Sequence, residues 1–505
     1  MTTVYVKKIN ESNMMFDSDE AGVIYEISEA FSFFAPGYKY DRRFRNHMWD
    51  GRIHLANART RLMPLGLIGE LKRFCEHYGY DFVDQTEQHM ITKIDSLDDF
   101  DSFVSSLNLP FEPRDYQINA VKHAIEKNRA TVISPTGSGK SLIIYLLIRW
   151  HLKYDRRFCL IVPTVSLVEQ MRTDFENYAK NDPSFNVDEI VQTIGGKKTQ
   201  GKTIDETKSI ITTWQSLQHY DTSFYNSFDV MYVDEAHQAT ASVLQKIYSS
   251  AVNVPYRCGF TGSLDEEKIH HLQLVGSLGD IFVVTTTKEL QDNGTLSPLK
   301  IHMITCKYPE DESKAFYRAN KKDYKAEIDY LNAHLKRNMF IRNIVLASKG
   351  TTMLLFNFKV HGAELSRLIT EKVKEDGIDR KVFFIDGNVS ADEREKIRQA
   401  MNEENGCILI SSVGTTATGL NIPSIQNVIL CPSKSKIRNI QSIGRGLRND
   451  KSSGKESCTV YDLVDDMSYG NGRSAHKNYC LKHAMDRLRQ YQEQQFDIDF
   501  HTVKF

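Results

Sequence analysis

Two separate series of short apolar segments, each followed by a helical stretch, limit the possible folds of this chain more than any other feature. The first series spans residues 130–134, 159–163, 210–213 and 230–234, and the second spans 352–356, 382–385, 407–411 and 428–431. Strands that alternate with helices favour parallel sheets with helices on both faces. The pattern therefore predicts an α/β protein with two doubly wound parallel-sheet lobes.

Three changes in composition divide the chain further. Residues 109–113 (Leu-Pro-Phe-Glu-Pro) indicate a linker, residues 307–336 are polar and charged, and residues 468–474 are rich in glycine. We expect an N-terminal domain at 1–108, lobes at 109–300 and 301–468, and a C-terminal helix and strand at 469–505. The helix is expected to share one apolar face, and the strand to alternate apolar with polar residues. The residues that indicate them are Leu481, Ala484, Met485, Leu488, Phe496, Ile498 and Phe500.

The composition of the 505-residue chain is that of an ordinary globular protein, with 41% hydrophobic and 26% charged residues. No run of about 18 apolar residues occurs, so we expect no membrane partner and a cytoplasmic location. The eight cysteines are scattered without a CxxC pair, which argues against a disulfide framework and against a zinc site. Because the net charge is −1, any surface that binds nucleic acid must be local.

A glycine-rich loop joins the first apolar segment to an apolar helix at residues 142–152. Glycines let backbone N–H groups surround a phosphate, and the helix N-terminus adds partial positive charge. We expect Lys140 to reach the β- and γ-phosphates of ATP and the Ser141 hydroxyl to hold Mg²⁺. A buried helix after a simple turn could have a similar sequence, and Ser134 stands where the motif usually has its first glycine. The residues expected to cradle the phosphates are Thr136, Gly137, Ser138 and Gly139.

The fourth apolar segment ends in Asp234-Glu235-Ala236-His237. Carboxylates at the end of a parallel strand lie at the sheet edge where ligands bind. We expect Asp234 to hold Mg²⁺ and Glu235 to orient and deprotonate the attacking water. Acidic residues also end strands as helix caps, but their place downstream of a phosphate loop indicates the second half of an ATPase site.

A third segment, Gln441-Ser442-Ile443-Gly444-Arg445-Gly446-Leu447-Arg448, follows the second series of strands. On a helix, Gln441, Arg445 and Arg448 would share one face. Two guanidinium groups suit a triphosphate, because their forked donors bind phosphate oxygens. A solvated basic helix face is the alternative. We expect the two arginines to take part in catalysis, with Arg448 as an arginine finger, and Gln441 to contact the nucleotide.

From residue 117 to residue 448, these segments follow the order seen in superfamily 2 helicases, and the chain resembles that family. The resemblance implies two RecA-like lobes with ATP and Mg²⁺ as cofactors, and it implies that Arg114 and Gln117 recognise adenine. Asn421 stands where the family commonly has Asp, so we leave it out of the catalytic set. The further matching segments are Arg114–Gln117, Val162–Thr164, Gly195–Gly196, Thr212–Gln215, Thr261–Ser263, Leu354–Phe356, Asp386–Gly387 with Arg394, and Ser411–Pro423.

The flanks at residues 44–52, 64–69 and 487–491 resemble the UvsW-like recombination and fork-remodelling helicases of T-even-type bacteriophages. This resemblance implies a small α/β N-terminal domain and activity on branched DNA. The activities implied are fork regression, Holliday-junction branch migration, and unwinding of R-loops and D-loops.

Residues 38–52 hold five basic and four aromatic side chains. Basic side chains grip phosphates and aromatic rings stack on unpaired bases, although the aromatics could equally form the core of a small domain. In the lobes, small hydroxyl and backbone groups are expected to hold the phosphodiester backbone without reading sequence. The nucleic-acid contacts we expect are Arg42, Arg43, Arg45, Trp49, Thr164, Thr213, Thr415 and Gly419.

The helicase motifs leave two other functions open. An RNA helicase would use the same two lobes and ATPase motifs. A nucleotide-gated binding module would change conformation on binding ATP without hydrolysing it productively. The UvsW-like flanks favour DNA, and Glu235, Arg445 and Arg448 are all present, which favours turnover. We expect a monomer that binds branched or duplex DNA by structure, including RNA–DNA hybrids, in the cytoplasm of the host cell.

Overall fold

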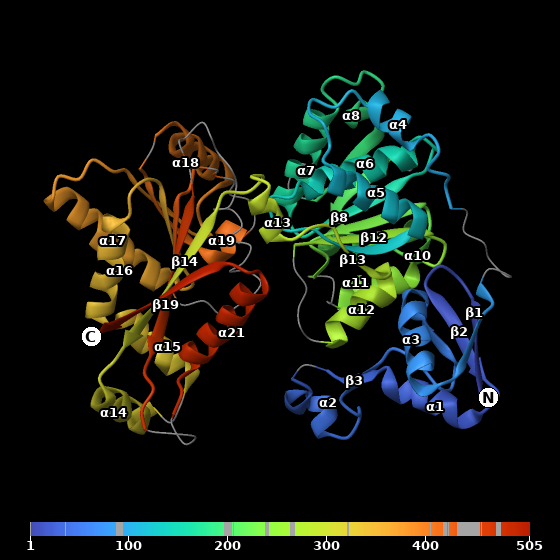
Figure 1. Ribbon diagram of the computed structural model, residues 1–505, viewed down its shortest axis with the longest axis horizontal. Helices are drawn as coiled ribbons and strands as arrows, with labels where there is room; N and C mark the ends of the chain where they lie inside the picture. The colour runs from blue at the N-terminus through green and yellow to red at the C-terminus, as the bar shows by residue number, and fades with distance from the viewer. Residues whose placement is uncertain are drawn as a thin grey trace. The chain divides into compact units, whose positions relative to one another are not determined.

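The computed structural model describes residues 2–35, 37–86, 94–195, 205, 207–237, 242–262, 268–320, 323–404, 406–417, 422, 424–431, 455, 457–470 and 476–505 (Figure 1). By its internal contacts the chain divides into two units. The first unit is Met1–Ser134 with Gly139–Val284, and the second is Pro135–Ser138 with Thr285–Phe505. No helix in these described ranges is long and apolar enough to cross a membrane.

The first unit begins with a small domain of mixed α/β structure, as expected. Its four-stranded sheet has the order β5-β2-β1-β6, with β1 antiparallel to β2 and parallel to β6. Alternate side chains of β1 and β2 pack with α1 and α3 in one core. The elements are β1 (Thr3–Lys8), β2 (Asn13–Ser18), α1 (Ala21–Ala30), β3 (Ser32–Phe34), η1 (Tyr38–Tyr40), α2 (Arg42–Arg45), β4 (Arg52–His54), β5 (Leu62–Pro64), η2 (Leu65–Leu67), α3 (Ile68–Tyr78) and β6 (Asp81–Asp84).

The same unit contains a seven-stranded sheet with the order β13-β7-β12-β11-β8-β10-β9, in which all paired strands are parallel. Helix α6 is buried along almost its whole length, as a helix covering such a sheet must be. Helix α4 precedes the expected linker, yet its Phe100 and Phe103 pack in the core of this first lobe. The elements are α4 (Phe100–Ser106), α5 (Asp115–Lys127), β7 (Arg129–Ile133), α6 (Lys140–Leu152), β8 (Phe158–Val162), α7 (Val165–Tyr178), α8 (Val187–Ile190), β9 (Val191–Ile194), β10 (Ser209–Thr213), α9 (Trp214–Leu217), α10 (Thr222–Tyr225), β11 (Val230–Asp234), α11 (Ser242–Ser250), β12 (Tyr256–Thr261), α12 (Lys268–Leu278) and β13 (Ile281–Val283).

The N-terminal domain is packed directly against this first lobe. Leu272 and Val275 of α12 join the apolar core of the domain. A Cβ on Gly66 would lie 2.0 Å from the carbonyl oxygen of Val275, so a larger side chain could not fit at this contact. Arg129 at the start of β7 forms an ion pair of 2.8 Å with Glu11 of the domain, and both side chains are mostly buried. The contact therefore combines apolar burial with a paired charge.

The second unit is built on another seven-stranded parallel sheet, with the order β16-β17-β15-β18-β19-β14-β20. The C-terminal strand β20 is one of its edges, and β14 crosses the expected boundary between residues 300 and 301. The elements are α13 (Thr287–Asp292), β14 (Leu299–Lys307), α14 (Glu310–Asn320), α15 (Tyr324–Ala333), α16 (Leu335–Ala347), β15 (Thr352–Phe356), α17 (Lys359–Glu375), β16 (Val382–Ile385), α18 (Ala391–Glu403), β17 (Ile408–Ser412), α19 (Val413–Ala417), β18 (Asn427–Leu430), β19 (Cys458–Asp466), α21 (Tyr479–Glu493) and β20 (Asp497–Lys504).

The fold class predicted from the sequence is confirmed. Each of the eight predicted strands is present within one residue of its expected bounds, and all eight cysteines are buried free thiols. The predicted apolar face of the C-terminal helix is wrong in part, because Met485 is 41% exposed whereas Arg487 is buried. Arg487 pairs with the buried Asp462 at 2.7 Å, and this ion pair rotates the helix away from the face that hydrophobicity alone would select.

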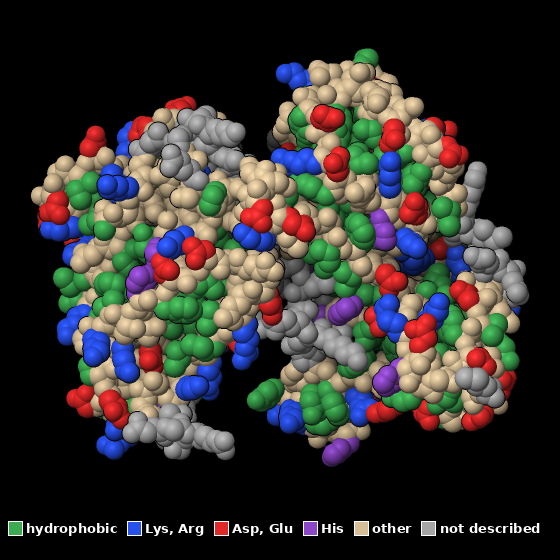
Figure 2. Space-filling model, in the orientation of Figure 1, with side chains coloured by type: hydrophobic (Ala, Val, Ile, Leu, Met, Phe, Trp, Pro, Cys, Tyr) green, Lys and Arg blue, Asp and Glu red, His purple; other side chains and the backbone are tan. Residues whose placement is uncertain are grey.

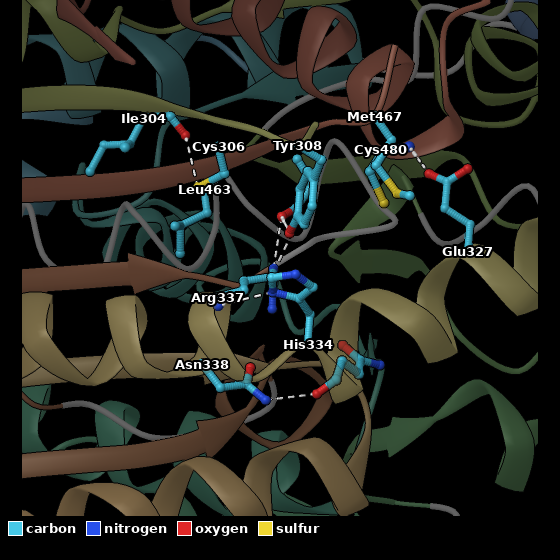
Figure 3. Close-up of polar contacts among 12 residues, drawn as sticks. Ile304, Cys306, Tyr308, Glu327, His334, Arg337, Asn338, Leu463, Met467 and Cys480 are labelled. Carbon is cyan, nitrogen blue, oxygen red and sulfur yellow. Dashed lines mark hydrogen bonds and ion pairs between the residues drawn. The ribbon is translucent and has the colours of Figure 1, made fainter. Parts of the chain in front are cut away.

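Buried charges anchor the helices of the second lobe to its sheet (Figure 3). Arg337 of α16 binds Asp465 of β19 through two hydrogen bonds of 2.7 and 3.1 Å. Glu327 of α15 accepts hydrogen bonds from the backbone N–H groups of Tyr479 (3.0 Å) and Cys480 (2.8 Å) at the start of α21. A carboxylate at a helix N-terminus satisfies N–H groups that lack a partner within the helix. The C-terminal helix is therefore an integral part of this lobe.

Candidate nucleotide and nucleic-acid sites

The glycine-rich loop joins β7 to α6 at the carboxyl edge of the first sheet. Gly139 is the N-cap of α6 with a φ of +83°, and Lys140 is the first helical residue. A Cβ on Gly139 would lie 2.3 Å from Nε2 of Gln117. Glycine thus permits both the left-handed backbone and the close approach of Gln117, and the loop meets the side chain predicted to recognise adenine.

The rest of the loop is partly accessible at Thr136 and Gly137, whereas Ser138 is buried. The Ser138 hydroxyl donates to the carbonyl oxygen of Pro135 at 2.6 Å, which closes the turn. Partly accessible residues next to a helix N-terminus are an arrangement suited to an anion. The loop is therefore compatible with the predicted phosphate cradle.

Lys140 and the two carboxylates predicted to work with it are in contact. Its Nζ lies 3.0 Å from Oε1 of Glu235 and 3.4 Å from Oδ1 of Asp234. Burial alone would lower the pKa of the Lys140 ammonium, but the charges of Asp234 and Glu235 outweigh burial and hold that pKa above its ordinary value. The strand order explains the meeting, because only β12 separates β7 from β11. The site thus gathers one cation and two anions at one sheet edge.

Glu235 has a φ of +52°, a left-handed conformation that is uncommon for a residue with a Cβ. Its backbone N–H donates to Oδ1 of Asp234 at 2.9 Å. Such conformations cost free energy and often occur at functional positions. The turn directs Glu235 to Lys140 instead of continuing the line of β11.

His237 and Thr261 are joined by a hydrogen bond of 2.9 Å between Nδ1 and Oγ1. Nδ1 of His237 also lies 3.3 Å from Oε2 of Glu235. Thr261 ends β12 and is fully buried. The Thr-Gly-Ser segment resembles a helicase motif, but the sequence does not indicate the contact of Thr261 with His237, because that contact depends on the pairing of β11 with β12.

Ser141 and Arg114, two further predicted ligands of the nucleotide site, have other partners in this structure. The Ser141 hydroxyl lies 2.7 Å from the Tyr178 hydroxyl, and no local sequence pattern indicates that Tyr178 is its neighbour. The backbone N–H of Arg114 donates to Oε1 of Gln117 at 2.9 Å, and the guanidinium of Arg114 donates to the Tyr116 hydroxyl at 3.0 Å. Gln117 is therefore fixed as a helix cap beside the loop, while Arg114 is exposed.

Three threonines predicted to contact nucleic acid lie where strands pass into helices. Thr164 caps α7 after β8, and Thr213 caps α9 after β10. These strands are neighbours with Thr213 paired to Val162, so both threonines lie along one sheet edge. Thr415 lies in α19 after β17, with its hydroxyl 2.6 Å from that of Ser412. The hydroxyls thus have structural roles that leave the functional prediction untested.

The basic and aromatic stretch forms a projecting corner of the N-terminal domain, in which Figure 2 shows blue and green side chains together. Arg42, Arg43 and Arg45 are exposed on α2. The Arg43 guanidinium pairs with Asp41 at 3.0 Å and lies 5.0 Å from the ring centroid of Trp49. The domain's main apolar core is built elsewhere. At this corner Tyr38 packs on Phe44 and Tyr40 is exposed, so the corner presents its cations to solvent while most of its rings are half-buried.

Several predicted residues lie outside the described part of the chain. They are Gly419, Gln441, Arg445 and Arg448; Asn421, to which no role is assigned, lies outside it as well. Their roles stay predictions, as do those of the described site residues.

The family comparisons agree with the motif order. Residues 4–84 match "DNA helicase UvsW, N-terminal", residues 110–266 match "Type III restriction enzyme, res subunit", and residues 335–450 match "Helicase conserved C-terminal domain". The chain is 32% identical over 508 residues to the ATP-dependent DNA helicase uvsW of Enterobacteria phage T4, covering 97% of this chain and 98% of that protein. It is 24% identical over 230 residues to the DNA 3'-5' translocase XPB2 of Sulfurisphaera tokodaii, covering 44% and 48%.

Comparison with solved structures also finds the T4 UvsW helicase. The crystal structure of T4 UvsW covers 99% of both chains at 30% identity and a TM-score of 0.51. A second structure of the UvsW helicase from bacteriophage T4 covers 56% of this chain and 99% of that one, at 33% identity and a TM-score of 0.50. A fragment of an HsdR subunit from Vibrio vulnificus shares the fold at 17% identity and a TM-score of 0.54.

Proposed function

This chain belongs to the UvsW family of ATP-dependent DNA helicases, and we propose that its substrate is branched DNA. The protein is an ATP-dependent DNA helicase with two RecA-like lobes. Fork regression, Holliday-junction branch migration, and unwinding of R-loops and D-loops are the reactions we propose. The observation that carries the proposal is the match to the UvsW N-terminal domain at residues 4–84, which a helicase engine alone would lack.

The N-terminal domain is proposed to recognise the branch. Arg42, Arg43 and Arg45 present three cations on one short helix, next to Trp49. Guanidinium groups can hold phosphates while an aromatic ring stacks on an unpaired base. The buried contacts of the domain with α12 and β7 would make the domain move together with the first lobe.

ATP is proposed to bind at the loop between β7 and α6, with Arg114 and Gln117 at the adenine and Thr136 to Gly139 around the phosphates. Lys140 would leave its carboxylate partners and bind the β- and γ-phosphates. Ser141 and Asp234 fit Mg²⁺ because a hydroxyl and a carboxylate are the oxygen ligands that this ion prefers; the bound ion would neutralise phosphate charge. Glu235 would then accept a proton from the attacking water.

The second lobe is proposed to complete the reaction. Gln441, Arg445 and Arg448 would contact the triphosphate when the lobes close, with Arg448 stabilising charge on the transferred phosphoryl group. Thr164, Thr213, Thr415 and Gly419 are proposed to hold the DNA backbone. RNA–DNA hybrids as substrates, a monomeric state and a cytoplasmic location stay predictions.

The test is an ATPase assay across forked DNA, a four-way junction, linear duplex, single-stranded DNA and RNA. Branched DNA is expected to give the strongest stimulation at equal nucleotide concentration. The Glu235→Gln variant serves as the control for contaminating ATPases. Equal stimulation by linear and branched DNA would refute the branched-substrate proposal, and preferential stimulation by RNA would favour an RNA helicase.

A further inference from the structure

Three metal-ligating side chains meet on one face of the edge of the second sheet, far along the chain from every residue assigned above. His302 belongs to β14, and Asp499 and His501 belong to the edge strand β20. His302 is paired in register with Asp499. Asp499 and His501 are two residues apart, so they project from the same face of their strand. The sheet register thus brings the three side chains together.

The distances between these side chains suit a common central ion. Nδ1 of His302 lies 2.9 Å from Nε2 of His501 and 3.8 Å from Oδ2 of Asp499. One ligand atom from each of the three side chains can be chosen so that all lie within 4.8 Å of one another. Ligands of a tetrahedral zinc ion with bonds of about 2.0–2.1 Å are separated by about 3.3 Å. Small changes of side-chain rotamer would equalise the distances.

The ring nitrogens already point toward each other. Two neutral imidazoles at this distance share one proton, since one nitrogen must donate and the other accept. When a metal ion binds, the donor ring can carry its proton on its other ring nitrogen instead, and each ring then offers a lone pair to the ion. The His302 ring is further oriented by stacking on Tyr461, with ring centroids 5.4 Å apart and planes at 19°. The pair is therefore held in place before an ion arrives.

We propose that His302, Asp499 and His501 bind a zinc-like divalent transition-metal ion that ties β20 to β14. Two imidazoles and one carboxylate favour Zn²⁺ over Mg²⁺, which prefers oxygen ligands. The scattered cysteines gave no zinc motif, and this site uses none of them. Lys300 pairs with Asp499 at 2.8 Å and is the cation that the metal would displace. Asp499 and His501 are accessible to solvent, which leaves the fourth position for water.

The ion would stabilise an edge strand of the sheet. Among the described strands, β20 is paired with β14 alone, and its side chains are exposed or half-buried. Just beyond it, Phe505 packs against Tyr308 and His334 of the lobe. A metal link between β14 and β20 would keep the edge strand paired and this aromatic contact in place. The site is thus proposed to stabilise structure, separately from the ATPase reaction.

The test uses the full-length protein after chelator treatment, titrated with Zn²⁺ against a chromophoric chelator in excess Mg²⁺, which occupies the carboxylates of the ATP site. One Zn²⁺ per chain is expected. Each of His302→Gln, Asp499→Asn and His501→Gln should lower the affinity by more than the roughly 10–100-fold that loss of an outer-shell hydrogen bond costs. His54→Gln is the matched control, because His54 is exposed and pairs with Asp50 in another domain.

Two further measurements identify the ligands and the effect. Co²⁺ bound in place of Zn²⁺ should give visible d–d bands without sulfur charge-transfer bands, and Zn²⁺ should slow hydrogen exchange of residues 497–504. The proposal is overturned if the three variants bind Zn²⁺ as wild type does, or if sulfur bands appear. It is also overturned if the variants destabilise β20 equally with and without Zn²⁺, because the three side chains would then form only a hydrogen-bonded cluster.

Discussion

The Nδ1 atom of His237 lies 2.9 Å from Oγ1 of Thr261, which links the ends of β11 and β12 beside the two carboxylates proposed to act in catalysis. His237 also contacts Glu235. The hydrogen bond therefore connects the residue proposed to activate water with the strand end that opens the Thr-Gly-Ser segment. A displacement of Glu235 and His237 would therefore be passed directly to Thr261 at the end of β12.

Thr261→Val should weaken the coupling between ATP hydrolysis and unwinding. Valine keeps the shape of threonine but cannot hydrogen-bond His237, and a typical hydrogen bond contributes about 0.5–1.5 kcal/mol. We expect DNA-stimulated ATPase activity within a few-fold of wild type and a larger loss of fork unwinding, measured by strand displacement per ATP hydrolysed. An unchanged ratio would show that the bond plays no part in coupling. Thr131→Val is the control for packing, because Thr131 is a fully buried threonine of β7 whose hydroxyl donates to the carbonyl oxygen of Gly279.

Glu235→Gln should leave ATP binding nearly intact while removing most turnover. The amide keeps the shape of the side chain but cannot accept a proton from water. General-base catalysis typically contributes about 10²–10⁴-fold, so kcat should fall by that order. Nucleotide affinity and steady-state ATPase rate are the measurements. Near-normal turnover would exclude Glu235 as the base.

Arg448→Ala should reduce DNA-stimulated turnover far more than ATP binding. An arginine finger acts on charge that appears only in the transition state, and its loss costs about 10³–10⁵ in rate. Arg448→Lys should not restore activity, because an ammonium lacks the planar fork. The defect should be small in the slow reaction without DNA. If the fractional loss is the same with and without forked DNA, Arg445 becomes the better candidate.

Replacing Arg42, Arg43 and Arg45 together with alanine should weaken fork binding and flatten its salt dependence. Each phosphate contact contributes about 0.9 to the slope of log K against log salt, so the slope should fall by up to about 2.7. Binding isotherms at several salt concentrations provide the measurement. Arg367→Ala is the control, since Arg367 is an exposed arginine paired with Glu364 and Glu371 of its own helix. A slope equal to wild type would argue that α2 does not touch DNA.

This triple variant is a sharper test than deletion of residues 1–108. The deletion would also remove the partner of Arg129 and expose Leu272 and Val275, which would damage the first lobe itself. It would further remove Phe100 and Phe103 from the lobe core. A loss of DNA binding after the deletion would therefore not identify its cause.

Asp465→Asn should destabilise the second lobe by about 3–5 kcal/mol, because it leaves the fully buried Arg337 guanidinium without its counter-charge. Chemical denaturation followed by fluorescence would report the change in the free energy of unfolding. Asp486→Asn is the matched control, since Asp486 pairs with Arg489 at the surface and surface pairs contribute about 0–1 kcal/mol. Equal stability of the two variants would mean that the Arg337 pair is not an anchor.

The sequence by itself determined the two parallel-sheet lobes and the motifs of the predicted ATP site. Alternating strand and helix patterns predicted both parallel sheets, since hydrophobic periodicity is a local property that burial enforces. The phosphate loop, Asp234 and Glu235 were identifiable because each motif is short and contiguous. The sequence also placed Lys140 and the two carboxylates at the same edge of the sheet, because parallel strands end at a shared edge.

Tertiary structure decided the contacts between residues that are distant in the chain. Three such contacts depend on strand order and helix docking, which no local pattern encodes. They join Thr261 to His237, Tyr178 to Ser141, and Gln117 to Gly139. The last helix buries Arg487, paired with Asp462, and exposes Met485, which the hydrophobic pattern alone did not predict. The cluster of His302, Asp499 and His501 likewise exists only through the register of β20 on β14, since sheet register is fixed by packing across the whole lobe.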